Sequence, residues 1–234
     1  MPNIVTYSHF FDRVRTGSVP PRGSESVWGV TMDPFRFIRT TPINADSDGI
    51  CASQIPAGAG ALTLNGALVT TVDGAAVAIL DYARAIVAAS DDAGDTTQIV
   101  TVTGYDIYNQ LMVETFALNG ASSISGKKAF KKVTSVSISA ATTGHVTVGT
   151  QNVFGLPFRV NSRDAMLVFF DTAFVTNGTF VAAVTTTATA TTGDVRGTFT
   201  PSGSPDGSKH LSYWLWCEDP DTIEGFYGVA QYAG

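Results

Sequence analysis

The chain has three histidines, and none of them lies in a pattern that performs chemistry. His9, His145 and His210 are far apart, and none belongs to an H-x-H, H-E-x-x-H or C-x-x-C motif, so their spacing signals no zinc or other transition-metal site. His145 follows a glycine at the start of a predicted strand, and His210 opens another strand after a turn. We interpret both as strand-edge histidines with local hydrogen bonds.

Motifs for nucleophilic catalysis and phosphate binding are also missing from the sequence. There is no G-x-S-x-G nucleophile elbow, no Walker pattern and no G-x-G-x-x-G loop. The one Asp-x-Arg pair near the end of the chain, Asp194 and Arg196, would share a face on a strand, where an ion pair or a contact with a neighbouring chain explains it. The sequence therefore predicts a protein that is not an enzyme and that uses no cofactor.

Three acidic clusters resemble fragments of calcium loops. They are DSDG at residues 46–49, DDAGD at residues 91–95 and EDPD at residues 218–221. None completes the D-x-D-x-D-G-x₅-E pattern that supplies enough oxygen ligands for calcium. We interpret all three as solvated turns, with calcium binding as the alternative.

The densest basic cluster is KKAFKK, residues 127–132. On a strand, Lys128 and Lys132 would share a face with Phe130. The cluster is small and contains one aromatic residue, which is too little for a nucleic-acid surface. We interpret it as a solvated loop, with docking against an acidic face of a neighbouring protein as the alternative.

Composition excludes several classes of protein. Of the 234 residues, 44% are hydrophobic and only 15% are charged, a balance that suits a chain burying much of its surface in itself or in an assembly. The net charge of −6 and the lack of a broad basic surface argue against nucleic acid as a partner. The apolar runs are too short to span a bilayer, and the N-terminus lacks the pattern of a signal peptide. Cys51 and Cys217 are predicted to be buried, reduced thiols.

Residues 1–60 read as an extended N-terminal arm. Six prolines prevent long helices and central strands there. Aromatic residues are nevertheless frequent, which is untypical of a flexible linker. We expect this arm to lie on its own domain or on a neighbouring subunit.

A β core is predicted for residues 61–234, with two β subdomains, 61–150 and 151–234, as a further division. Asn65-Gly66 predicts a hairpin turn between two short strands. The alanine-rich stretch 76–90 is ambiguous, and we assign a strand to about residues 84–89. Short strands with turn signals at regular spacing favour an all-β fold, either a β-sandwich or a barrel-like core.

The strand HLSYWLWC, residues 210–217, is apolar on both faces. Leu211, Tyr213 and Leu215 alternate with Trp214 and Trp216. Both faces must therefore be covered, one of them by another chain if the domain cannot cover it.

The segment from Ile99 to Gly149 resembles a β-rich domain of structural proteins from tailed bacteriophages. The pattern combines a TG-x-D turn, an M-x-E-T strand, a strand of the form K-x-F-x-x-V-x-S-V-x-I and a VTVG ending. The matching residues are Gly104, Asp106, Met112, Glu114, Thr115, Phe130, Val133, Ser135, Val136, Ile138 and Gly149. The turn-rich segment 191–211 is also similar to such virion proteins.

This resemblance implies a virion component assembled in the host cytoplasm, specifically a capsid decoration or cement protein. Its partners would be the major capsid protein and further copies of itself, for instance as a trimer. The alternatives are a collar, adaptor or tail component, and a carbohydrate-binding module for host recognition. The residues expected to make protein contacts are Phe10, Phe11, Arg13, Arg15, Trp28, Phe35, Phe37, Trp214 and Trp216.

Overall fold

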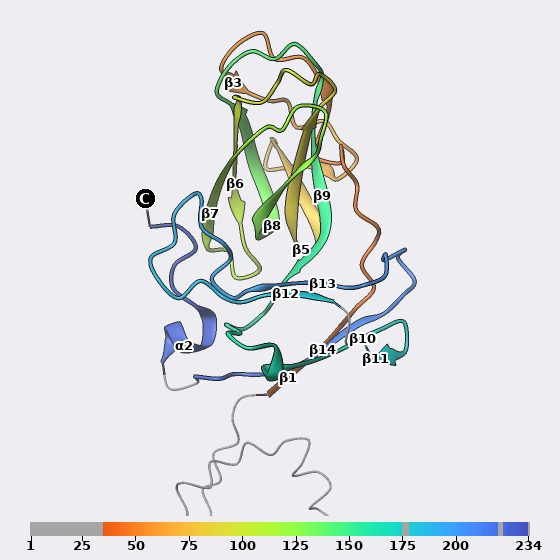
Figure 1. Cartoon of the computed structure of the whole chain (residues 1–234), viewed down its shortest axis with the longest axis vertical. Helices are drawn as coiled ribbons and strands as arrows, with labels where there is room; N and C mark the ends of the chain where they lie inside the picture. Colours follow the sequence, from red (N-terminus) through yellow and green to blue (C-terminus); the bar gives the residue numbers. More distant parts are fainter. Residues whose placement is uncertain (1–34, 175–177, 220–221, 234) are drawn as a thin grey trace, which may run out of the picture.

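A computed structural model of the chain describes residues 35–174, 178–219 and 222–233. The protein is 47% strand and 4% helix, which confirms the predicted all-β class. A large antiparallel sheet curls into a half-barrel, and a smaller sheet packs at one end of it (Figure 1). The predicted arm up to residue 34 lies outside the described residues.

The elements follow one another along the chain with few helical turns between them. The strands are β1 (Phe35–Thr40), β2 (Cys51–Gln54), β3 (Gly60–Ala61), β4 (Val69–Val72), β5 (Ala75–Ser90), β6 (Ile99–Tyr105), β7 (Leu111–Ala117), β8 (Ile124–Ile138), β9 (Val146–Gly155), β10 (Met166–Phe170), β11 (Ala173–Phe174), β12 (Thr179–Val181), β13 (Thr198–Thr200) and β14 (Leu211–Trp216). A 3₁₀ turn, η3 (Arg163–Ala165), precedes β10, and a short helix, α2 (Ile223–Tyr227), follows β14.

The large sheet has the strand order β12-β13-β9-β5-β8-β6-β7, and β2, β3 and β4 pair with β9, β8 and β5. The smaller sheet has the order β1-β14-β10-β11. Every pairing between named strands is antiparallel. The long strands β5 and β8 are interrupted by register shifts, and such bulges increase the local bend and twist that curl a sheet.

The buried hydrophobic residues form two clusters, and the second is lined by strands of both sheets. The first contains residues between Ile50 and Val148, and the second contains residues between Phe154 and Cys217. The division falls within β9, whose two ends belong to different clusters. This position is close to residue 150, where the sequence suggested a division of the core.

Residues 35–60, which the sequence assigned to the arm, contribute β1 and β2 to the sheets. The segment between these strands is tied to the large sheet by a buried arginine. Arg84 is 1% exposed, and its Nη2 donates to Asp81 Oδ2 at 2.7 Å and to the carbonyl oxygen of Ile43 at 2.8 Å. The same carboxylate oxygen accepts the backbone N–H of Ile43 at 2.9 Å.

The predicted hairpin turn at Asn65-Gly66 is wrong. Both backbone N–H groups donate to the carbonyl oxygen of Ile50, and the Asn65 side chain accepts the N–H of Ala52 at 2.9 Å. A Cβ on Gly66 would lie 2.2 Å from the backbone of Gly49, so glycine is needed there for close packing. The hairpin turn instead lies at Asp73-Gly74, between β4 and β5.

Candidate functional site

The outer face of the smaller sheet carries some of the aromatic residues that the sequence singled out. On β14, Leu211, Tyr213 and Leu215 are fully buried in the second cluster, whereas Trp214 and Trp216 on the opposite face are half-buried. This confirms the predicted alternation of β14, because successive side chains on a strand point to opposite faces.

Phe37 and Trp214 form the centre of this aromatic face. They are register partners in the β1–β14 ladder, their ring centroids are 4.8 Å apart and their planes are tilted by 57°. Leu167 of β10 is the partner of Trp214 on its other side. Phe37 is 48% exposed, so the row of three apolar side chains reaches solvent at the β1 edge. We call Phe37, Trp214 and Leu167 the aromatic row.

The other predicted contact residues are placed only in part. Phe35 pairs through its backbone with Trp216, which is half-buried against the second cluster. The remaining five lie outside the described residues: Phe10, Phe11, Arg13, Arg15 and Trp28.

Lysine 128 is buried, which corrects the prediction that residues 127–132 form a solvated loop. Lys128 lies on β8 with no exposed surface, and its Nζ donates to the backbone carbonyl of Gln231 in the C-terminal segment. Burial lowers the pKa of Lys128, and the negative charges of Glu114 and Asp194 partly oppose this shift. A buried ammonium needs such partners, and they come from positions far along the chain.

Asp194 holds three separate segments together. Its Oδ2 accepts the backbone N–H of Ala129 at 3.0 Å, and its Oδ1 accepts the N–H of Arg196 at 2.9 Å and the side-chain amide of Gln231 at 3.2 Å. Gln231 is itself fully buried. The carboxylate therefore fixes both the loop before β13 and the C-terminal segment against β8.

Arg196 does not pair with Asp194, as its sequence spacing suggested, but with Asp106. Its Nη1 lies 2.9 Å from Asp106 Oδ2, and both side chains are at most 2% exposed. Arg196 Nε also donates to the carbonyl oxygen of Leu156 at 3.1 Å. Asp106 Oδ1 accepts two backbone N–H groups of the β6–β7 turn, so this ion pair joins the turn to the loop before β13.

Among these buried carboxylates, Glu114 is the one whose pKa is raised toward neutral pH. It is 2% exposed and accepts the backbone N–H groups of Lys127 and Lys128. Burial raises the pKa of Glu114 to about 7, although the two N–H groups and the charge of Lys128 oppose the shift. Such a group can act as an acid or a base, but in the described part of the chain the Glu114 carboxylate accepts its hydrogen bonds from backbone N–H groups.

His145 and Asp95, two other titratable side chains with specific partners, take part in hydrogen bonds between neighbouring loops. His145 accepts or donates through Nδ1 at 3.0 Å from Asp91 Oδ2 on the surface. Asp95 in the acidic stretch 91–95 is buried, and its carboxylate accepts hydrogen bonds from the Ser90 hydroxyl and from the backbone N–H groups of residues 143 and 144. In the described ranges, no group of three or more His, Cys, Asp or Glu side chains is arranged to hold a metal ion.

The two cysteines form no disulfide with each other and lie in separate clusters. Cys51 belongs to the first cluster and Cys217 to the second, and both are buried. Burial raises the pKa of Cys51 to about 12, which keeps the thiol protonated and unreactive at neutral pH.

Comparisons with protein-family models, with curated proteins and with solved structures found no match. Within the part of the chain that is described, no helix is both long and apolar enough to cross a membrane.

Proposed function

We propose that this chain is a structural protein of a tailed bacteriophage virion, and specifically a decoration protein that binds the major capsid protein. The observation that carries the proposal is the aromatic row on the outer face of the smaller sheet. Phe37 is 48% exposed there beside Trp214, on an edge strand that directly follows the N-terminal segment. Aromatic side chains that are partly exposed in one subunit are typical centres of protein interfaces.

The buried charges support a structural role better than a catalytic one. The side chains of Glu114, Lys128, Asp194 and Arg196 make their contacts with backbone groups, with the Gln231 side chain or with Asp106. They join β7, β8, the loop before β13 and the C-terminal segment into one unit. A rigid body of this kind presents a fixed surface to a partner and loses little conformational entropy on binding.

The mechanism is stabilisation by mass action. A protein that binds the assembled shell but not free capsid subunits adds its binding free energy to the shell. Full burial of a Phe or Trp side chain contributes about 2–3 kcal/mol by area removed from water. The aromatic row alone would then give a modest affinity, and many copies on one shell would make the total effect large.

Two other functions make different predictions. A collar or tail component would be present in a handful of copies per particle, whereas a decoration protein would be present in many. A carbohydrate-binding module would present a flat aromatic platform to a sugar ring. The 57° tilt between Phe37 and Trp214 provides no such shared plane, which favours a shaped protein partner.

The test is co-sedimentation of the purified chain with capsids that lack it. A Phe37→Ala/Trp214→Ala double variant is expected to lose binding at least tenfold. Leu111→Ala is the matched control, because Leu111 is similarly exposed, at 45%, on β7 of the large sheet. Equal binding by the double variant and the control would refute a role for the aromatic row.

A second variant tests the N-terminal segment. Its truncation should stop at residue 34, because residues 35–40 form β1 of the smaller sheet. If the arm carries the predicted contacts, the truncated chain keeps its folded circular dichroism spectrum and loses capsid binding. Undiminished capsid binding by the truncated chain would rule out the arm as the contact surface. Capture of the full chain on a glycan array would favour the host-recognition function instead.

A further inference from the structure

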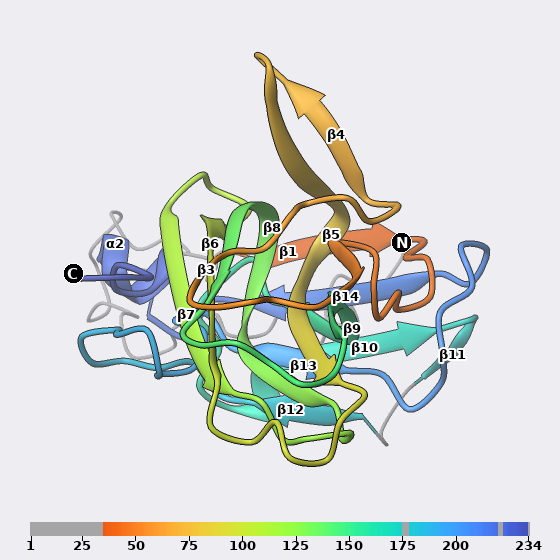
Figure 2. The same cartoon turned by 90° about the horizontal axis from the view of Figure 1, so that it is seen from above.

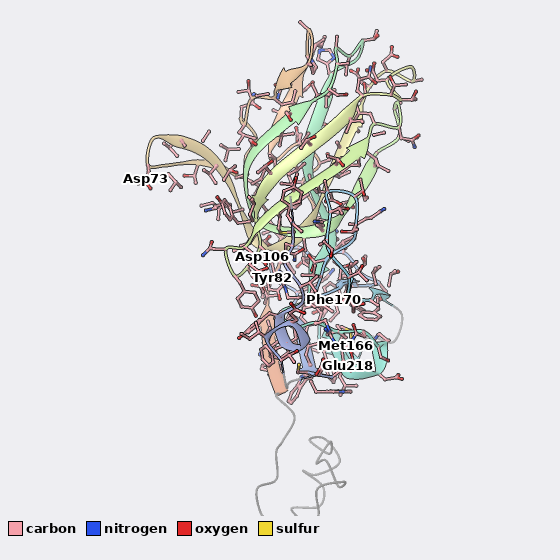
Figure 3. The ribbon with its side chains drawn as sticks, turned by 90° about the vertical axis from the view of Figure 1, so that its left-hand side faces the viewer. Asp73, Tyr82, Asp106, Met166, Phe170 and Glu218 are labelled. Carbon is pink, nitrogen blue, oxygen red and sulfur yellow. The ribbon has the colours of Figure 1, made fainter. Side chains whose placement is uncertain are left out.

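The β4–β5 hairpin stands away from the body of the protein (Figure 2). Residues 70–76 are all exposed, and Asp73 marks the outer end of the projection (Figure 3). Asp73 and Gly74 have φ values of 50° and 82°, the left-handed geometry that a two-residue type I′ hairpin turn requires. The projection is therefore a regular β-ribbon with its own turn chemistry.

The base of the hairpin is fixed to the large sheet. Ala78 and Ile79 pair with β8 on the side opposite to β4. Just beyond the base, the Lys131 ammonium donates to the carbonyl oxygens of Leu80 and Asp81. A ribbon anchored in this way is held in one direction, which lowers the entropy cost of binding through it.

The outer edge of β4 is open. Ile79 N donates to the carbonyl oxygen of Leu68 at 3.1 Å, and hydrogen-bonded pairs alternate along an antiparallel ladder. Thr70 and Val72 therefore turn their backbone groups toward β5, and Thr71 turns its N–H and C=O outward. In the described part of the chain, these two groups of Thr71 meet no hydrogen-bond partner.

Nothing in the hairpin protects this edge from another strand. Edge strands are usually guarded by lysine, proline or a bulge. Residues 69–79 contain no lysine and no proline, and Asp73 at the tip is their only charged residue. One face of the ribbon is also apolar, with Val72 40% and Ile79 44% exposed on the same side as Ala75. A two-stranded ribbon with an uncovered apolar face is marginally stable by itself.

We propose that β4 pairs with β4 of a second copy of this chain, antiparallel and across a two-fold axis, with Thr71 opposite Thr71 of the second copy. This register joins the outward N–H and C=O groups of both threonines in two hydrogen bonds. It also sets Thr70 opposite Val72, so the apolar faces of the two hairpins lie on the same side of a continuous ribbon.

Charge favours this occupant. In the proposed register, each Asp73 lies opposite Val69 of the other copy, so the two carboxylates are at opposite ends of the joint ribbon. Their separation of four residues corresponds to about 13 Å along the strands, beyond the screening length of about 8 Å at physiological ionic strength. The strand is uncharged between these ends, so pairing with its own copy brings no like charges together.

The contact is small, so it should be weak in isolation. Seven exposed residues a side are well below the roughly 20–30 residues of a standard interface. The expected result is a concentration-dependent monomer–dimer equilibrium, which a high local concentration on a particle would drive toward the dimer. The proposal does not depend on the virion function, since it concerns the isolated chain.

The test is sedimentation velocity of the full chain from about 1 to 500 µM, a range chosen for weak, small interfaces. Thr71→Lys and Thr71→Glu each place like charges directly opposite one another, and each is expected to weaken the dimer at least tenfold. A mixture of the two variants should restore association, because Lys then faces Glu. Thr97→Lys is the control, since Thr97 is exposed in the loop before β6.

Each outcome decides the proposal. Recovery in the mixture, with thermal melts showing that both variants are folded, supports residue 71 facing its own copy. A wild-type chain that stays monomeric at every concentration overturns it and assigns the hairpin to another occupant, such as residues 1–34 or a capsid subunit. A dimer that is insensitive to both charged variants, or variants that do not recover when mixed, also overturns it.

Discussion

The buried carboxyl group of Glu114 should make the stability of this protein fall as the pH rises toward neutral. The pKa of Glu114 is raised by burial from its ordinary value of 4.5 to about 7 in the folded chain. Because the folded pKa is the higher one, the folded state binds the proton more tightly than the unfolded state. The stabilisation is therefore complete below pH 4.5 and is lost as the pH rises through about 7.

The size of the effect follows from the shift. One pKa unit corresponds to about 1.4 kcal/mol, and a shift from 4.5 to about 7 gives roughly 3 kcal/mol in total, of which about 2.5 kcal/mol falls between pH 5 and pH 8. Glu114→Gln keeps an oxygen for the N–H groups of Lys127 and Lys128 but carries no proton that titrates. The variant should therefore lack this part of the pH dependence.

The assay is urea unfolding of both chains at several values between pH 5 and pH 8. The difference in unfolding free energy between Glu114→Gln and the wild type should move in favour of the variant by about 2.5 kcal/mol over this range. Any stability that the variant loses because an amide replaces the carboxyl group is independent of pH, so it cancels when the differences at two pH values are compared. Glu224→Gln, at an exposed position on α2, is the control and should leave the profile of the wild type unchanged. Parallel profiles for the wild type and Glu114→Gln would refute the reasoning.

Three further predictions concern single side chains. Gly104→Ala should destabilise the chain by about 1–3 kcal/mol, because its Cβ would lie 2.0 Å from the carbonyl oxygen of Lys132. Gly58→Ala, whose Cβ would meet no atom within 4 Å, should change the free energy of chemical unfolding little. Lys128→Met should cost about 3–5 kcal/mol, because it leaves two buried carboxylates and the Gln231 carbonyl without their cation, and hydrogen exchange should show the C-terminal segment losing protection first. The Cys51 thiol, with a pKa raised to about 12, should react with a disulfide reagent at pH 8 only at the rate of opening, and rapid labelling in the native state would contradict its burial.

Features that depend on neighbours in sequence were predictable. The alternation of β14 is an example, since the period of two places Tyr213 inside and Trp214 outside on any strand. The strand at residues 84–89 was also predicted, but β5 runs from Ala75 to Ser90. Its alanines favour helix in isolation, and pairing with β8 and β9 on its two sides overrides that preference.

Features that depend on distant partners were not predictable. Lys128 looked like a solvated lysine, because its partner Gln231 is 103 residues away. Arg196 likewise pairs with Asp106 and not with the nearby Asp194. The turn at Asp73-Gly74, by contrast, was predictable. Asp-Gly is as strong a hairpin turn signal as Asn-Gly, and the alanine-rich strand β5 begins directly after it.

The position of the matching residues limits what the resemblance to phage structural proteins implies. Met112, Glu114 and Phe130 are all buried, and Gly104 is required by close backbone contact. Residues of this kind maintain a sheet whatever the protein binds. Buried residues of this kind do not say which partner a protein binds. The two proposed contact surfaces, the aromatic row and the β4–β5 hairpin, lie outside the matched segment and at different places on the chain. Variants there can separate the proposed binding to a shell from the proposed self-association while the buried core stays intact.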